Sequence, residues 1–331
     1  MMKKMIVALV AVCAAVGAAS PAFAQISTQM TRDQVVALTP KWTGERFADG
    51  RPKVPDDLLK RVTVLTLEDI WDPLRDFNYV NQFENDWQML HPDEPFAGRA
   101  VTMQYMPSRP DLGEALRGGG GRGGGGGGMP VALLQNGDVV VADGFGKIAE
   151  GTLTGSNGAN NIYNHTHDGV VFYGGVRDTK ELREIKGFNG VFKDSDPSAI
   201  LNEQLTAIDG PVRIGRAVVL PGDLVYATRD GVLFIPAEMA NLVISEGEFL
   251  DLEDDYNFNV VQPAQAKAGQ PSGEPGGWSH QIHTEFATYI HSHPDLLKMT
   301  PAEFDGLEAK ADRPRVPRPP VDNCRTPGLC P

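Results

Sequence analysis

Two short segments of the sequence carry residue types that can together bind an anion and a cation. Gly155-Ser156-Asn157-Gly158 stands where a loop is expected to turn into a helix, so its backbone N–H groups can point together at a carboxylate or phosphate. Gly174-Gly175-Val176-Arg177-Asp178 follows an apolar run and supplies a guanidinium and a carboxylate. The guanidinium suits a keto or enolate oxygen, and the carboxylate suits a divalent cation. The two segments therefore suit different parts of one α-keto acid.

Both segments also have plain structural interpretations. The glycine pair before Arg177 can form a tight turn, and Arg177-Asp178 can be a surface ion pair that contributes less than about 1 kcal/mol. The residue types alone leave both interpretations open.

The elements that must position these segments are those of a βαβ unit. Apolar runs predict buried strands at residues 131–134, 138–142 and 169–173, and residues 155–167 predict a helix between the last two. In such units ligands collect at the carboxyl ends of the strands and at the helix N-terminus. The predicted unit therefore brings the two segments to one edge of a sheet.

Further elements follow from apolar periodicity and from turn residues. We expect a helix around residues 65–74 with Thr66 as its N-cap. The other expected strands are residues 99–105, 191–192, 212–219, 224–227 and 232–235, and the other expected helices are residues 236–252 and 278–290.

The chain divides into an export signal, an arm, a main domain and an extension. Lys3 and Lys4, the apolar residues 5–19 and Ala22-Phe23-Ala24 predict a signal peptide at residues 1–24, hence a periplasmic or secreted protein. We expect an N-terminal arm at residues 25–60, the main domain at residues 61–252, and a C-terminal extension with a Pro-rich tail at residues 253–331.

Residues 118–128 are glycine except for Arg122. A phosphate-binding loop would end in Gly-Lys-Ser/Thr and lead into a helix, whereas this run ends in Met129-Pro130. We expect a flexible insert in the main domain.

The overall charge and the cysteines exclude some classes of partner. The net charge is −13 and no basic stripe is present, which argues against nucleic acid as a partner. No stretch after the signal approaches the roughly 20 apolar residues of a membrane span, so we expect no membrane partner after cleavage. Cys324 and Cys330 are expected to form a disulfide loop, with free thiols as the alternative.

Several histidines are possible metal ligands or substrate contacts. His280, His283, His291 and His293 match a zinc site by count, but no Cys or Glu falls at a convincing fourth position, so we expect a solvated amphipathic helix. One of His165 and His167, near the mouth of the predicted site, is a candidate substrate contact.

From Gly155 to Asp178 the sequence resembles the signature of the RraA-like family. This family includes 4-hydroxy-4-methyl-2-oxoglutarate and 4-carboxy-4-hydroxy-2-oxoadipate aldolases that also decarboxylate oxaloacetate, while some relatives regulate ribonuclease. Supporting segments occur in the family's order, and the resemblance extends over roughly residues 60–290. These segments are residues 96–102, 137–144, 211–215, 221–223 and 230–232.

The resemblance implies an α/β fold of the swivelling β/β/α type, with a central mixed sheet or barrel, assembled as a homotrimer or a dimer of trimers with sites between subunits. It implies that Gly155 to Gly158 form the substrate loop and that Arg177 binds substrate. Asp178 would bind Mg²⁺ or Mn²⁺, and Glu181 would support the ion through water. The family also uses a C-terminal acid from a neighbouring subunit, for which Glu246, Glu248 and Glu253 are candidates.

The implied activity is that of a class II-type lyase that cleaves or decarboxylates a 4-hydroxy- or 4-carboxy-2-oxoacid to pyruvate. The chain departs from the family at Ser156, where aldolases often carry Glu or Asp, which puts the substrate in doubt. The alternative is a non-catalytic exported binding or regulatory module on the same fold. Methyl transfer is disfavoured because no methyl-donor loop is present.

Overall fold

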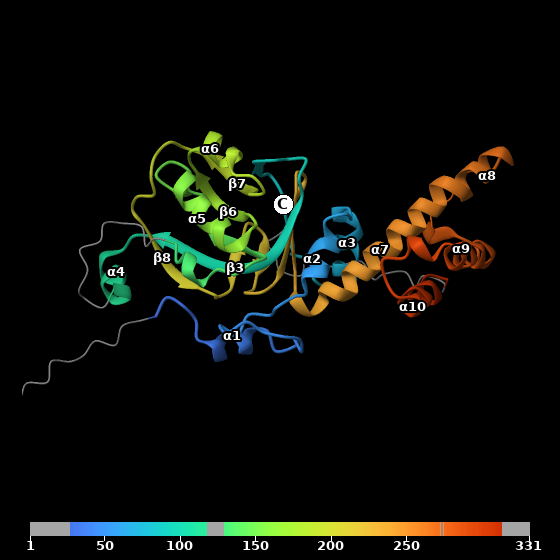
Figure 1. The fold of residues 1–331 in the computed structure, drawn as a ribbon, viewed down its shortest axis with the longest axis horizontal. Coiled ribbons are helices and arrows are strands. Elements are labelled where there is room, and N and C mark those ends of the chain that lie inside the picture. Colours follow the sequence, from blue (N-terminus) through green and yellow to red (C-terminus); the bar gives the residue numbers. More distant parts are fainter. Residues whose placement is uncertain (1–26, 118–128, 272, 274, 313–331) are drawn as a thin grey trace, which may run out of the picture.

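The computed structural model describes residues 27–117, 129–271, 273 and 275–312 (Figure 1). Ten of the described strands form one mixed sheet, in which β3 (Phe96–Pro107), β4 (Asp138–Asp143), β6 (Val170–Val176) and β7 (Gly190–Ser195) run parallel as neighbours. The short β5 (Thr152–Thr154) also pairs in parallel with β6. The predicted βαβ arrangement is therefore confirmed.

Antiparallel strands complete the sheet on both sides. The strands β11 (Leu224–Thr228) and β12 (Gly231–Ile235) form a hairpin, and β11 pairs with β3. The strand β8 (Glu203–Ile208) pairs with the C-terminal half of β3. At the two ends of the path, β1 (Phe83–Glu84) pairs with β12 and β2 (Gln88–Met89) pairs with β7. Because β1 and β2 do not pair with each other, the described strands form a mixed sheet and not a closed barrel.

Both faces of the central strands are covered. Every residue of β4 is buried, as expected for a parallel strand that has elements packed on each side. On one face, α5 (Ser156–Thr166) and α6 (Thr179–Glu184) contribute Ala159, Ile162 and Leu182 to a core with Val140 and Phe172. On the other face, the hairpin of β9 (Val212–Ile214) and β10 (Ala217–Val219) covers the sheet.

The N-terminal segment is tied to the sheet by a buried ion pair. The Arg51 side chain is fully buried and donates from Nη1 and Nη2 to the two carboxylate oxygens of Asp138 at 2.9 and 3.0 Å. The helices of this part are α1 (Arg32–Leu38), α2 (Asp56–Val62) and α3 (Leu67–Asp76). The predicted Thr66 cap of α3 is confirmed as a capping box with Asp69.

The C-terminal part is helical and extends away from the sheet (Figure 1). The helix α7 (Ala240–Tyr256) packs its first half on α2 and α3 and continues through a π-helical turn (Asn257–Val261) into α8 (Gln262–Lys267). Two helices, α9 (His280–Ser292) and α10 (Pro301–Ala311), pack on its outer half around Phe249, Phe286 and Phe304. None of the described helices combines the length and apolar character of a membrane span.

Three expectations about secondary structure need correction. Residues 131–134 are not a strand, because Leu133 N–H and Leu134 N–H bond back to Pro130 and Val131 in a 3₁₀ turn. Residues 212–219 form a hairpin and not one strand, because Gly215 at φ 57° reverses the chain. The strand β8 was missed, since its polar sequence hides its pairing with β3.

One further helix is α4 (Pro110–Arg117). A 3₁₀ turn (Ala237–Met239) follows Pro236 and leads into α7. The predicted signal peptide at residues 1–24, the glycine run at residues 118–128, and the predicted Cys324–Cys330 disulfide lie outside the described residues.

Candidate active site

The two segments predicted to act together do meet, at the edge of the sheet where β5 and β6 end. Gly155 directly follows β5 and is the N-cap of α5, and Arg177 and Asp178 directly follow β6. The Ser156 N–H donates to Asp178 Oδ2 at 3.0 Å, with the Ser156 hydroxyl 3.4 Å from the same oxygen. Residues 22 positions apart in the sequence are therefore in direct contact.

Arg177 and Asp178 form an ion pair that is about one-third exposed. Arg177 Nε lies 3.5 Å from Asp178 Oδ2, and the two side chains are 35% and 37% exposed. No described residue accepts a hydrogen bond from the Nη atoms of Arg177. The outer face of its guanidinium is thus open to an anionic or carbonyl oxygen.

The backbone at Asp178 is held in the left-handed region, at φ 59° and ψ 35°. This conformation is uncommon for residues other than glycine, although Asp tolerates it better than most. Two backbone hydrogen bonds fix it, from Arg177 N–H to Thr154 O and from Leu182 N–H to Asp178 O, each 3.0 Å long. The turn that follows β6 therefore sets the direction of both side chains.

Two glycines of the predicted loop are required by space. A Cβ on Gly155 would lie 2.4 Å from Asp178 Oδ2 and 2.8 Å from Arg177 Nε. A Cβ on Gly158 would lie 2.4 Å from Thr154 Oγ1. Real Cβ atoms almost never approach neighbours this closely, so side chains at these positions would displace the charged pair or the β5 threonine.

The backbone amides of residues 155–158 have two different roles. The amide of Ser156 donates to Asp178 Oδ2 and does not point outward from the loop. The amides of Asn157 and Gly158 lie in the first turn of α5, where N–H groups have no partner within the helix. These two donors, with the positive end of the helix dipole, remain for a carboxylate.

Asp178 has one carboxylate oxygen left for a cation. Its hydrogen bonds with described residues go to Oδ2, and Oδ1 accepts none from them. A Mg²⁺ ion in proteins is commonly held by one or two carboxylates and keeps several waters, and Mn²⁺ takes the same ligands. The donors present therefore fit such an ion. Glu181 lies exposed in the first turn of α6 and makes no hydrogen bond or ion pair with a described residue.

The three acids considered as C-terminal partners of the site are engaged elsewhere. All lie buried in α7. Glu246 accepts from Lys310 Nζ at 2.5 Å, and Glu248 accepts from Arg61 at 2.7 and 2.8 Å. Glu253 lies beside His283 and Glu308. None of the three is presented on the surface for a neighbouring subunit.

The expectation for His165 and His167 was wrong. Both lie at the C-terminal end of α5, whereas the candidate site lies at its N-terminal end. His165 Nδ1 is 2.8 Å from Asn161 O, and the ring of His167 packs edge-on against Tyr163. An α-helix rises about 1.5 Å per residue, so the length of α5 separates these rings from Asp178.

Sequence comparisons relate the chain to known proteins. The model of the RraA-like family, described as Aldolase/RraA, matches residues 67–234. A 4-hydroxy-4-methyl-2-oxoglutarate aldolase from Thermus thermophilus is 34% identical over 100 residues, which are 30% of this chain and 60% of that protein. A Deinococcus radiodurans protein provisionally named for the same activity is 33% identical over 144 residues, which are 43% of this chain and 79% of that protein.

A solved structure shares the fold. RraAS2 from Streptomyces coelicolor, described as an unusual member of the RNase ES inhibitor RraA protein family, is 22% identical with a TM-score of 0.51. The likeness covers 63% of this chain and 96% of that chain. From the family match and the shared fold, the chain belongs to the RraA-like family.

Proposed function

We propose that this protein is a metal-dependent lyase that releases pyruvate from a 4-hydroxy- or 4-carboxy-2-oxoacid. The observation that carries the proposal is the contact between the two loops. Asp178 lies against the amide of Ser156, and the Arg177 guanidinium beside it has an open face. The names of the Thermus and Deinococcus relatives support an aldolase reaction.

In the proposed complex each group takes one part of the substrate. The amides of Asn157 and Gly158 bind the carboxylate of the 2-oxoacid, and Arg177 binds the 2-keto oxygen. Asp178 would hold Mg²⁺ or Mn²⁺ through Oδ1, and Glu181 would order water near the ion. A bound divalent cation supplies positive charge beside the oxygen that becomes negative.

The reaction then follows from where charge develops. Water takes the proton of the 4-hydroxyl group, the C3–C4 bond breaks, C4 becomes a carbonyl, and the electron pair moves onto the 2-keto oxygen as an enolate. In the decarboxylation of oxaloacetate C4 is itself the carboxylate carbon, so the C3–C4 bond breaks, CO₂ leaves, and the electron pair moves onto the 2-keto oxygen as the same enolate. Arg177 stabilises the enolate in both cases, and protonation at C3 gives pyruvate.

We further propose that the protein acts outside the cytoplasm after its signal is removed, and that it forms the homotrimer or hexamer that the resemblance implies. A non-catalytic binding module is the competing function. It predicts that 2-oxoacids bind without turnover.

A pyruvate assay tests the proposal. Purified protein with Mg²⁺ or Mn²⁺ should release pyruvate from oxaloacetate or from 4-hydroxy-4-methyl-2-oxoglutarate, and EDTA should stop the release. Asp178→Asn should also abolish the activity, whereas Glu184→Gln, which removes an exposed carboxylate from α6, should retain it. Activity that survives both EDTA and Asp178→Asn would exclude the metal role.

A further inference from the structure

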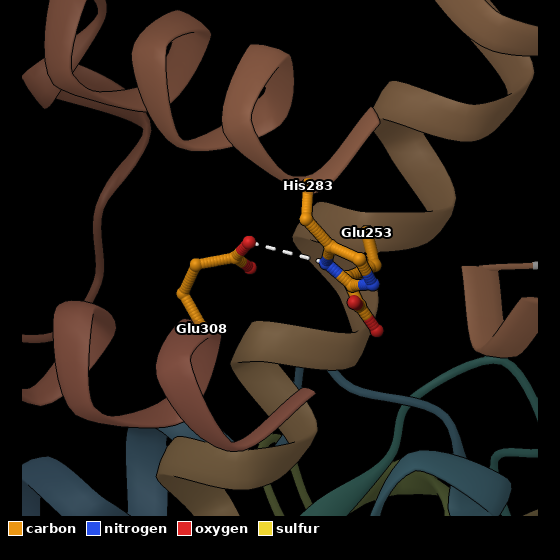
Figure 2. A group of neighbouring side chains, drawn as sticks. All are labelled: Glu253, His283 and Glu308. Atoms are coloured by element: carbon orange, nitrogen blue, oxygen red, sulfur yellow. Dashed lines mark hydrogen bonds and ion pairs between the residues drawn. The ribbon is translucent and has the colours of Figure 1, made fainter. Parts of the chain in front are cut away.

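The C-terminal helices bring together a histidine and two glutamates far from the candidate active site. Glu253 of α7, His283 of α9 and Glu308 of α10 are all buried, and they offer ligand atoms that all lie within 4.8 Å of one another (Figure 2). His283 Nδ1 lies 3.1 Å from Glu308 Oε1. Three helices that are separate in the sequence therefore each point one possible metal ligand at a common place.

The cluster holds more hydrogen-bonding capacity than the described residues use. Glu308 is 9% exposed, and its second oxygen, Oε2, is buried without a hydrogen-bond partner among them. Asn257, one helical turn beyond Glu253, has a buried Oδ1 in the same condition, as does Trp278 Nε1, whose ring packs 5.5 Å from that of His283. Unsatisfied buried polar atoms are rare and costly, so the unpartnered Glu308 oxygen beside His283 indicates a binding site for a ligand.

The charge of the cluster indicates the sign of that ligand. Two ionised carboxylates carry a charge of −2 and an imidazole carries at most +1, so the cluster is negative in either protonation state of His283. Both carboxylates are buried, and burying a carboxylate away from water is costly unless a positive charge lies beside it. A cation between the ligands would remove that cost.

The other histidines of α9 and its C-cap have different partners from His283. His280 pairs with Asp312 at 2.6 Å and His291 pairs with Asp305 at 2.8 Å, both at exposed positions. His293 stacks on Tyr289. Only His283 among these four faces two carboxylates in the part of the chain that the structure describes.

We propose that Glu253, His283 and Glu308 bind one divalent transition-metal ion, which fastens α9 and α10 to α7. Imidazole nitrogen and carboxylate oxygen are both zinc ligands, at about 2.0–2.2 Å from the ion. Tetrahedral ligands at those bond lengths lie about 3.4 Å apart, so the 4.8 Å limit requires only small side-chain movements. Water fills the fourth position, as it does at zinc sites with three protein ligands.

This proposal is independent of the proposed lyase function and of Asp178. The full chain with Asp178→Ala is therefore the starting protein for the test, since an ion at the candidate active site would otherwise be counted. After chelation and dialysis, Zn²⁺ is added, and bound metal is measured by elemental analysis and by calorimetric titration. We expect one Zn²⁺ per chain.

Matched variants locate the ion. Adding Glu308→Gln or His283→Gln to the Asp178→Ala protein should abolish this binding, whereas adding His291→Gln should leave it unchanged. Glu308→Gln keeps the size of the side chain, so it should fold. Its thermal midpoint should not respond to Zn²⁺, whereas that of the protein with Asp178→Ala alone should rise by several degrees.

Two results would overturn the proposal. In the first, the Asp178→Ala protein takes up no Zn²⁺ after chelation, which would leave His283 in a metal-free ion pair with the glutamates. In the second, Zn²⁺ binding persists in both the Glu308→Gln and the His283→Gln proteins, which would place the ion elsewhere.

Discussion

Replacing Gly155 with alanine should impair the candidate active site while leaving the fold intact. The added Cβ would lie 2.4 Å from Asp178 Oδ2, whereas ordinary van der Waals contact begins near 3.4 Å. The Asp178 carboxylate must therefore retreat by about 1 Å, which breaks its hydrogen bond from Ser156 N–H. A misplacement of about 1 Å in a catalytic group costs on the order of 100-fold in rate.

The cost in stability should be small. The backbone at Gly155, with φ −130° and ψ −172°, is an extended conformation that alanine adopts freely. The pair that would be disturbed is about one-third exposed, and such pairs contribute less than about 1 kcal/mol. The loss of activity should therefore appear in a protein whose unfolding in urea is nearly unchanged.

The assay is kcat/KM for pyruvate release, with Gly306→Ala as the control. Gly306 lies in α10, and a Cβ there meets nothing within 4 Å. A Gly155→Ala protein that retained more than half of the wild-type kcat/KM would refute the assignment of this loop to the active site.

Three more predictions concern stability. Arg51→Ala should lower the free energy of unfolding by about 3–5 kcal/mol, because it leaves the buried Asp138 carboxylate without its cation. Urea titration measures this free energy, and a loss below about 1 kcal/mol would contradict the prediction. Burial, with Glu238 nearby, raises the pKa of Asp223 to about 8, so the stability that depends on its protonated form is complete below pH 4 and is lost as the pH rises toward 8. The free energy of unfolding of Asp223→Asn should therefore rise relative to that of the wild type between pH 5 and pH 8, by up to about 1.4 kcal/mol per pH unit. A difference between the two proteins that stayed constant with pH would contradict this. Thr66→Ala should cost about 1 kcal/mol through loss of the α3 capping box, seen as a lower urea midpoint, and an unchanged midpoint would count against it.

The meeting of Gly155 and Asp178 was predictable because it follows from local rules. A strand, a helix and a parallel strand must return the chain to the same edge of the sheet, so loops that follow β5 and β6 become neighbours. The sequence pattern did not predict that Asp178 would occupy the Ser156 amide, since side-chain direction depends on the left-handed turn at Asp178.

Features that depend on distant pairing were not predictable in this way. The apolar residues 131–134 look like a strand, but they form a turn that begins at Pro130, and only Leu134 is buried, in the core that includes residues of α5. The proposed metal ligands, Glu253, His283 and Glu308, lie 30 and 25 residues apart on different helices. Their spacing in the sequence therefore does not predict a metal site. The histidine count of α9 was a signal, but the partners that distinguish His283 come from α7 and α10.

The most direct test of the lyase account compares two arginines. Arg177→Ala should lower kcat/KM for pyruvate release by on the order of 100-fold or more, because it removes a cation aimed at the developing enolate. Arg183→Ala, which removes an exposed guanidinium from α6, should leave kcat/KM within about twofold of the wild type, since side chains away from the reacting atoms contribute little to the rate. Equal effects of the two substitutions, or a wild-type protein that releases no pyruvate from any 2-oxoacid with either metal, would contradict the account.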